Sequence, residues 1–310
     1  MQRQKKLSAL RRVLGPFFLR GEEAVFFCPK HPARAGRPTG QLSVNVRTDW
    51  FNCWSCGFKD RSLVPLLRLG DRETLAEYVD ELLGSGPRRK DPPKKQHVSP
   101  FLPAEFRSIS VESREPAWHA TMAYLSRRGV TPEESLRFKV GYCSTGEYRN
   151  RVIFPSFDDV GDLNFFVGRD IYDTSVRYKH PEFDKDIIFN DYLVDWTKPV
   201  TLVEGPFDAI SAGENSIPLQ GTILDRRSRL FRKIVMTGVD VYWALDGDAF
   251  KKQLSLISSL LEYGNKSFHV DMRDVKDPNS ARKEFSSMKV RAQLVESEID
   301  LIKVRVNACR

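Results

Sequence analysis

The sequence has no long hydrophobic run and few cysteines. Among its 310 residues, no stretch approaches the roughly 18 consecutive apolar residues of a membrane-spanning helix, and the charged start is not followed by the apolar segment of a secretory signal. Only five cysteines are present, an odd number that does not suit a disulfide framework, and three of them lie in the first 56 residues. We therefore expect a cytoplasmic protein without a membrane partner, and a metal site near the N-terminus.

Basic residues are unevenly distributed along the chain. The formal net charge is +8, and the first 90 residues alone contain 17 Lys and Arg against 9 Asp and Glu. The rest of the chain is therefore balanced in charge. A compact basic module attached to a neutral body favours binding to a polyanion, although a solvated basic face without a ligand has the same composition.

Composition and periodicity divide the chain into segments. Hydrophobic residues make up 41% of the chain, enough for more than one core at this length. A stretch rich in Gly, Pro and basic residues predicts an extended linker, and leucines with helical spacing precede it at 61–83. From residue 200, short apolar strands alternate with helices in the pattern of a parallel sheet. The predicted divisions are a domain at 1–83, a linker at 84–100, and segments at 101–197, 198–277 and 278–310.

Two short cysteine motifs have the spacing of a zinc site. Cys28 and His31 are three positions apart. Cys53 and Cys56 repeat this spacing after an interval of 21 residues. Three thiolates and one imidazole form the closed tetrahedral ligand set that structural Zn²⁺ prefers, and an alternating strand and turn over residues 42–49 predict a β-hairpin between the motifs. The alternative, buried cysteines without a metal, leaves His31 and the odd thiol unexplained.

Carboxylates follow two of the predicted strands in the second half of the chain. Glu204 follows one apolar run, and Asp246 and Asp248 follow another. Because the carboxyl ends of parallel strands form the ligand crevice of an α/β sheet, we expect these side chains to converge. Hard oxygen ligands of this kind select Mg²⁺ or Mn²⁺. Asp208, which follows Glu204 after a Gly-Pro turn, would either join them or cap the next helix.

The cysteine region resembles a known zinc domain. The pattern Phe-Cys-Pro-x-His at 27–31, followed by Phe-x-Cys-Trp-x-Cys-Gly at 51–57, is similar to the zinc ribbon of bacterial and phage DnaG-type DNA primases. The resemblance implies that the ribbon reads a template, with cations for phosphates and aromatic rings for stacking on bases. The residues that would do so are Arg47, Trp50, Trp54 and Lys59. The two tryptophans are explained equally well as core residues beside the zinc.

The strand-end carboxylates resemble the catalytic domain of the same enzymes. A glutamate followed about 40 residues later by Asp-x-Asp is similar to the TOPRIM domain shared by DnaG primases, topoisomerases and some nucleases. The resemblance implies that the three strand-end carboxylates hold catalytic ions, with Asp208 as a further catalytic carboxylate and Asp277 as a further metal ligand. Two positions depart from the family. Asn279 stands where a second carboxylate is usual, and Ala249-Phe250 replaces the usual Ala-Gly.

Basic residues upstream of these strands follow the order found in the basic subdomain of the same family. They recur beside turns rather than along one helical face. The resemblance assigns five of them to NTP and template binding: Arg128, Arg151, Arg169, Arg177 and Lys185. At Arg177 the family usually has lysine, so the charge is kept with a different donor geometry. Taken singly, each of the five is also compatible with an ordinary surface position.

Together these features predict a multidomain protein of the α+β and α/β classes, with a hairpin-based zinc ribbon, a basic α/β subdomain and a TOPRIM parallel-sheet domain. The implied function is that of a DNA primase, which makes short RNA primers on single-stranded DNA from NTPs, with one structural Zn²⁺ and catalytic Mg²⁺ or Mn²⁺. The implied protein partner is a replicative helicase acting in trans, and we expect a monomer. Two alternatives use the same features: a TOPRIM nuclease or topoisomerase that cleaves DNA, and a non-catalytic zinc-ribbon protein that only binds nucleic acid.

Overall fold

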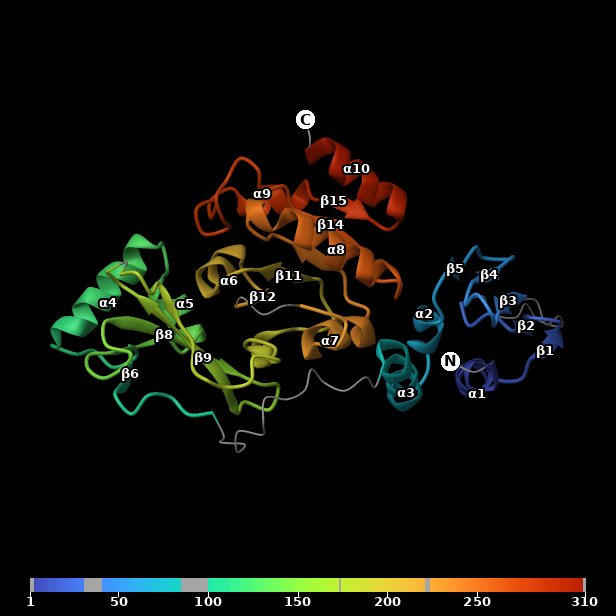
Figure 1. Cartoon of the computed structure of the whole chain (residues 1–310), viewed down its shortest axis with the longest axis horizontal. Helices are drawn as coiled ribbons and strands as arrows, with labels where there is room; N and C mark the ends of the chain where they lie inside the picture. Colours follow the sequence, from blue (N-terminus) through green and yellow to red (C-terminus); the bar gives the residue numbers. More distant parts are fainter. Residues whose placement is uncertain (1–2, 31–40, 85–99, 173, 221–223, 309–310) are drawn as a thin grey trace.

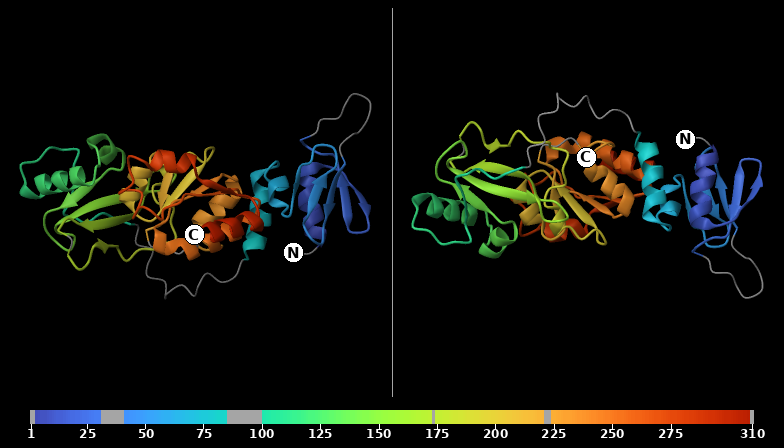
Figure 2. Two further views of the ribbon diagram at one scale, coloured as in Figure 1. Left: turned by 90° about the horizontal axis from the view of Figure 1, so that it is seen from above. Right: turned by 90° about the horizontal axis from the view of Figure 1, so that it is seen from below.

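The computed structural model describes residues 3–30, 41–84, 100–172, 174–220 and 224–308. Within these residues the strands form three sheets of five strands each, so the expected mixture of α and β structure in several units is confirmed. The N-terminal sheet lies at one end of the molecule, the second sheet at the other end, and the third sheet between them (Figure 1, Figure 2). None of the described helices is long and apolar enough to cross a membrane.

The N-terminal sheet is antiparallel and contains the predicted hairpin. Its strands, in sheet order, are β1 (Phe18–Arg20), β2 (Glu23–Phe26), β3 (Leu42–Asn45), β4 (Phe51–Cys53) and β5 (Lys59–Asp60). Alternate residues of β3 face the core, as a period of two requires. β3 pairs with β4 through Leu42 opposite Cys53, which confirms the hairpin. Helix α1 (Arg3–Leu14) adds Leu10 to the core that these strands share.

Two helices lead from the N-terminal sheet to the third sheet. α2 (Val64–Leu67) and α3 (Arg72–Leu83) occupy the stretch of helical spacing, with a break between them. Asp71 begins α3 by accepting a hydrogen bond from Thr74 N at 2.7 Å. α3 contacts α7 (Arg229–Thr237), and one hydrophobic core continues from the N-terminal helices into the third sheet. The N-terminal unit is therefore packed against the unit that carries the strand-end carboxylates.

Arg68 lies at this junction, in the break between α2 and α3, and its guanidinium is largely buried. It donates hydrogen bonds to Val235 O at 2.7 Å, Tyr263 O at 3.2 Å and Asn265 Oδ1 at 2.6 Å. Val235 is in the last turn of α7, and Tyr263 follows α8 (Phe250–Leu261), so the cation meets the carbonyl ends of two helices. Burial lowers the pKa of Arg68 to about 10, which leaves it charged at neutral pH.

The second sheet is antiparallel throughout. Its strands, in sheet order, are β10 (Tyr178–Lys179), β9 (Leu163–Asp170), β8 (Arg151–Phe157), β7 (Gly141–Cys143) and β6 (Phe106–Ser108). Helices α4 (Pro116–Arg127) and α5 (Pro132–Arg137) accompany it (Figure 1). Thr131 and Glu134 form a capping box that begins α5, with Pro132 at the first helical position. The sharp turn between α4 and α5 places Arg128 at the end of α4.

The third sheet is mainly parallel, which confirms the alternation of strands and helices predicted from residue 200. Its strands, in sheet order, are β12 (Ser216–Pro218), β11 (Val200–Val203), β13 (Val241–Trp243), β14 (Ser267–His269) and β15 (Gln293–Val295). The first four are parallel, and β15 is antiparallel to β14. The accompanying helices are α6 (Pro206–Ala212), α7, α8, α9 (Phe285–Val290) and α10 (Glu298–Ala308). The sheet thus continues beyond residue 277 through β15.

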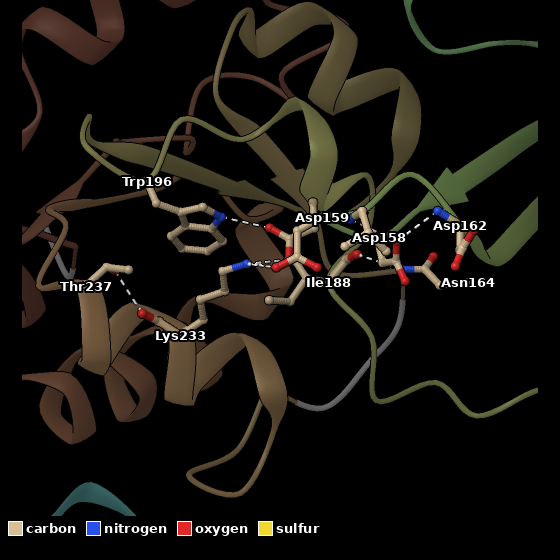
Figure 3. A network of polar contacts seen from close by, with 10 residues as sticks. Asp158, Asp159, Asp162, Asn164, Ile188, Trp196, Lys233 and Thr237 are labelled. Atoms are coloured by element: carbon tan, nitrogen blue, oxygen red, sulfur yellow. Dashed lines mark hydrogen bonds and ion pairs between the residues drawn. The ribbon is translucent and has the colours of Figure 1, made fainter. Parts of the chain in front are cut away.

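A polar network joins the second and third sheet units. Lys233 of α7 contacts Asp159, in the turn between β8 and β9, at 3.2 Å, and Asp191 at 2.6 Å (Figure 3). Asp191 belongs to the short helix η1 (Asp191–Leu193) and also accepts a hydrogen bond from Trp196 Nε1 at 2.7 Å. Because Asp191 is buried, its two donors compensate for the loss of hydration. The network holds one end of the β8–β9 hairpin against α7.

Candidate functional site

Three cysteines gather at one point of the N-terminal sheet. The Sγ atoms of Cys28, Cys53 and Cys56 all lie within 4.8 Å of one another, and those of Cys28 and Cys56 are 3.7 Å apart. Cys28 follows β2 and Cys53 ends β4, so the sheet brings together residues 25 positions apart. Gly57, with φ +72°, allows the turn in which its N–H donates to Cys53 O at 2.9 Å. His31, the predicted fourth ligand, lies outside the described residues.

The chemistry of this cluster fits zinc. Burial raises the pKa of the Cys28 thiol to about 12, so without a cation this thiol stays protonated at neutral pH. A bound Zn²⁺ would reverse this, because coordination deprotonates a thiol outright. Three sulfur donors at this spacing match a structural zinc site, which has four ligands. The cysteine part of the predicted zinc ribbon is therefore assembled.

The N-terminal sheet also exposes aromatic and basic side chains. Trp50 is 45% and Trp54 72% exposed, so neither ring is a core residue. Arg47 and Lys59 are exposed as well. Arg47 Nε contacts Glu22 Oε2 at 2.7 Å, but both side chains face solvent, and such a pair is worth at most about 1 kcal/mol. The four predicted template-reading residues are thus all available at the surface.

The strand-end carboxylates lie at one edge of the third sheet. β11 and β13 are adjacent and parallel with Leu202 opposite Trp243, so Glu204 and Asp246 both follow the carboxyl ends of neighbouring strands. Asp248 is in the short helix η2 (Gly247–Ala249), and its side chain is outside the described part of the structure. Among the side chains that are described, no three carboxylates are gathered closely enough to form a metal cluster. Glu204 and Asp246 therefore share an edge of the sheet, and the convergence of the three side chains stays a prediction.

Asp208 lies beside this edge at the beginning of α6. Its Oδ2 accepts a hydrogen bond from Gly205 N at 3.0 Å, so the residue does cap the helix. Its Oδ1 accepts from Asn279 N at 3.3 Å. Burial, and then the negative charge of Asp277, raise the pKa of Asp208 to about 6. The charge of Asp277, a predicted metal ligand, therefore acts on Asp208, a predicted catalytic carboxylate, and a cation near them would relieve this repulsion.

Arg128 connects the second sheet unit to this carboxylate edge. Its guanidinium lies over the ring of Phe207, 4.6 Å from the centroid, next to Asp208 in α6. Its backbone carbonyl accepts a hydrogen bond from Asn279 Nδ2 at 3.0 Å. The charge of Arg128 acts on Asp208 by lowering its pKa, against the stronger effect of burial. The predicted basic residue and the predicted carboxylates are therefore neighbours.

Arg169 lies near the same place and is held by aromatic residues. Its Nε donates to Tyr124 Oη at 3.0 Å, and its guanidinium carbon is 4.9 Å from the centroid of Tyr178. A Cβ added to Gly205 would be 3.5 Å from Tyr178 Oη, so this hydroxyl reaches the turn after β11. Sequence reasoning missed Tyr178, although it directly follows the predicted Arg177.

The other three predicted basic residues have different surroundings. Arg151 is buried, and its guanidinium lies 3.7 Å from Asp170 Oδ2 and donates to Arg177 O at 3.4 Å. Arg151 therefore stabilises the β8–β10 region from within. Arg177 and Lys185 are exposed. Arg128, Arg169 and Tyr178 thus form the part of the basic subdomain that faces the carboxylate edge.

Comparisons with known proteins find relatives of this chain by sequence. No protein-family model matches the chain. The DNA primase of Halalkalibacterium halodurans is 23% identical over 94% of this chain and 57% of its own length. The DNA primase of Listeria innocua is 22% identical over 71% of this chain and 44% of its own length. The chain resembles bacterial DNA primases. It spans about half the length of the curated primases that it matches.

One solved primase structure matches most of the fold. The crystal structure of the zinc-binding and RNA polymerase domains of Aquifex aeolicus primase covers 90% of this chain, and the match covers 81% of that structure. The TM-score is 0.51 and the sequence identity is 17%. At this identity the likeness concerns the fold. The fold of this chain is therefore similar to that of a primase region that joins a zinc-binding domain to a polymerase domain.

Proposed function

We propose that this chain is a DNA primase, which synthesises short RNA primers on a single-stranded DNA template. The observation that carries the proposal is a combination within one chain. A cysteine cluster fit for zinc and a carboxylate edge flanked by Arg128 and Arg169 occur together in a fold similar to that of the two primase domains. Sequence similarity to bacterial primases over 94% of the chain supports the same function.

The carboxylates of the third sheet would hold the catalytic Mg²⁺ or Mn²⁺ in a TOPRIM arrangement. The proposed ligands are Glu204, Asp246, Asp248 and Asp277. Oxygen donors at the carboxyl edge of a parallel sheet suit these hard cations, and the raised pKa of Asp208 points to a place where positive charge is favourable. When bound, the ions would supply charge stabilisation for the reacting phosphoryl group and the departing pyrophosphate. Asp208 itself would order the turn after β11 by holding Gly205 N.

Basic residues of the second sheet unit would bind the NTP and the template. Arg128 and Arg169 are placed beside the carboxylate edge, where the triphosphate of an incoming nucleotide needs cationic partners. Arg177 and Lys185 are exposed and would contact the template strand farther out. Arg151 contributes indirectly, since it is buried against Asp170. We propose that these residues hold substrate while the carboxylates serve the chemistry.

The N-terminal sheet would recognise the template. His31 would complete the zinc ligands begun by the three cysteines, and the ion would hold the ribbon in shape. The exposed rings of Trp50 and Trp54 offer stacking surfaces for unpaired bases, with Arg47 and Lys59 as phosphate partners. The helicase partner and the monomeric state expected from the resemblance stay predictions.

The proposal is tested by incubating the protein with a single-stranded template, Mg²⁺ or Mn²⁺ and labelled NTPs. Short RNA products that require the template are the expected outcome. Cleavage of the DNA would instead identify a TOPRIM nuclease or topoisomerase activity. A mobility shift of the template with neither product would identify a protein that only binds nucleic acid, and either result would overturn the primase function.

A further inference from the structure

Asn279 occupies the junction between the second and third sheet units. Its side-chain Nδ2 donates to Arg128 O at 3.0 Å and to Ser211 Oγ at 2.8 Å, and its backbone N donates to Asp208 Oδ1 at 3.3 Å. Arg128 ends α4, whereas Ser211 and Asp208 belong to α6. One residue thus connects the turn that carries a predicted substrate cation to the helix that carries a predicted catalytic carboxylate.

The chemistry of these contacts requires an amide rather than a carboxylate. Each of the two Nδ2 hydrogens of Asn279 is directed to a separate acceptor, and one of them is a backbone carbonyl that can only accept. An ionised aspartate has no hydrogen to donate. At this position the oxygen that replaces Nδ2 would face the carbonyl oxygen of Arg128, and the added negative charge would lie near Asp208, which accepts from the backbone N of residue 279. The carboxylate that is usual here in the family is therefore incompatible with the connection that this chain makes.

Neighbouring contacts support the same connection. Arg282, three residues after Asn279, forms an ion pair with Glu134 in the first turn of α5. Gly129 lies in the sequence between Arg128, which Asn279 contacts, and Glu134. Its φ is +73°, and a Cβ added to it would be 3.6 Å from Arg282 Cδ. The loop that contains Asn279 and Arg282 therefore contacts the turn between α4 and α5 on both sides of Gly129. The position of the Arg128 backbone is set by this loop and not by α4 alone.

The guanidinium of Arg128 has a donor that no described residue uses. Its Nε is buried and donates to no acceptor in the described part of the chain. The guanidinium rests on the Phe207 ring, which orients it without using its donors. A buried donor of this kind is costly unless an acceptor, such as a water molecule or a phosphate oxygen of a ligand, completes it. The backbone tether from Asn279 thus determines where this donor meets a ligand.

We propose that Asn279 is a positioning residue for triphosphate binding: it fixes the Arg128 turn over α6, so that the guanidinium stays beside the carboxylate edge. The inference rests on the proposed primase function, because that function supplies the nucleoside triphosphate. It assigns to position 279 a role as a neutral double donor in place of the charge that is usual there. The relevant comparison is between an amide and the isosteric carboxylate.

Two variants test the role, and a third is the matched control. Asn279→Asp keeps the shape but removes both donated bonds and adds a charge, and Asn279→Ala removes the donors alone. Asn215→Asp makes the same chemical change in another tether, where Asn215 Nδ2 donates to Pro199 O at 2.9 Å and Asp195 O at 3.0 Å. Asn215 directly precedes β12, so it lies at the amino end of the parallel sheet, away from the carboxylate edge. All three variants are made in the full chain.

Two measurements are made on each variant. The first is binding of a fluorescent ATP analogue with Mg²⁺, followed by anisotropy, and the second is amide hydrogen exchange of the α4–α5 turn. We expect Asn279→Asp to weaken nucleotide binding at least tenfold and Asn279→Ala to weaken it less, with faster exchange at residues 126–131 in both. Asn215→Asp is expected to change nucleotide affinity less than twofold, whatever its melting temperature.

The outcomes separate this inference from the proposed function. Unchanged exchange in the α4–α5 turn of both Asn279 variants would overturn the tether, even in a protein that makes primers. An equal loss of nucleotide affinity in Asn215→Asp would overturn the positioning role, because general destabilisation would then explain the effect. The wild-type chain could also bind no nucleotide while the Asn279 variants show faster exchange at residues 126–131. This result would contradict the primase function and the role in triphosphate binding, and it would support only the structural connection between Asn279 and the α4–α5 turn.

Discussion

The cysteine cluster and the carboxylate edge are both candidate metal sites, yet they are assembled differently. The sulfur atoms of the three cysteines lie within 4.8 Å of one another, whereas the described carboxylates share an edge without forming such a group. Burial raises the pKa of Cys28 to about 12, whereas at Cys53 the effect of burial is outweighed by hydrogen bonds from the backbone of Cys56 and Ser55, which lower its pKa. A protonated thiol carries no charge, so Cys28 can lie close to the other two sulfur atoms before a metal is bound. Carboxylates at neutral pH repel each other instead. The three sulfur atoms are thus gathered by the fold of one sheet, whereas repulsion opposes a similar gathering of carboxylates unless a cation is bound.

Loss of a zinc ligand should have the largest effect of the changes considered. Cys53→Ser and Cys56→Ser should each lose the zinc and template-dependent initiation, because a small zinc domain relies on a metal-binding free energy of about 10 kcal/mol or more. Zinc content by atomic absorption and urea unfolding of the N-terminal sheet measure the effect. Cys143→Ala, at a buried cysteine outside the cluster, is the control and should keep one zinc. Full zinc occupancy in a chain with both Cys28→Ser and His31→Ala would show that the cysteine cluster is not the zinc site.

Removal of a strand-end carboxylate should stop chemistry without disturbing binding. Asp246→Ala and Glu204→Gln should each abolish primer synthesis, since one ligand of a catalytic metal is worth several kcal/mol in the transition state. Affinity for the template should change little, because it comes from cations and aromatic rings. Primer yield and template affinity are measured on the same preparations, with Asp240→Ala at the amino end of β13 as control. If Asp246→Ala stays within tenfold of wild type, about 1.4 kcal/mol, the active site lies elsewhere.

The two regions can also be separated physically. Arg68→Ala removes the cation that binds the ends of α7 and α8, and leaves buried carbonyls without a donor. We expect a loss of about 3 kcal/mol in the free energy of unfolding, together with a larger radius of gyration by small-angle X-ray scattering. Arg72→Ala, at an exposed position at the start of α3, is the control and should leave both unchanged. An Arg68→Ala chain with wild-type stability and dimensions would show that the apolar contacts alone hold the N-terminal unit.

The smallest expected effect concerns the exposed face of the N-terminal sheet. Trp54→Ala should weaken binding of single-stranded DNA by about 1–3 kcal/mol, the usual value for one stacked base. The melting temperature should not change, because Trp54 is 72% exposed. Phe18→Ala is the matched control, since Phe18 of β1 is an aromatic residue of the same sheet and is 74% exposed. If Trp54→Ala binds DNA as tightly as the wild-type chain does, Trp54 has no part in template recognition.

Much of the candidate site could be predicted because its signals are local. The cysteine spacing and the alternation around Leu42 are properties of short stretches, and the structure confirms the hairpin between the cysteine motifs. Apolar runs that end in Glu204 and Asp246 marked parallel strands, and parallel pairing placed these residues at one edge. The basic residues were less predictable. A cation beside a turn has the same sequence context whether it lies over the ring of a neighbouring unit, like Arg128, or beside an internal carboxylate, like Arg151.

The sequence by itself determined the ligand chemistry, the order of strands and helices, and the location of the basic excess. These follow from residue type and short-range period, which do not require knowledge of distant partners. Only the tertiary structure decided that Arg68 binds Val235, 167 residues away, and that Asn279 joins Arg128 to α6. Such contacts depend on how separate units pack, and a lone polar residue has no periodic pattern that reveals its partner. The physical reason is that a buried donor must find an acceptor, but which acceptor is near depends on the whole fold.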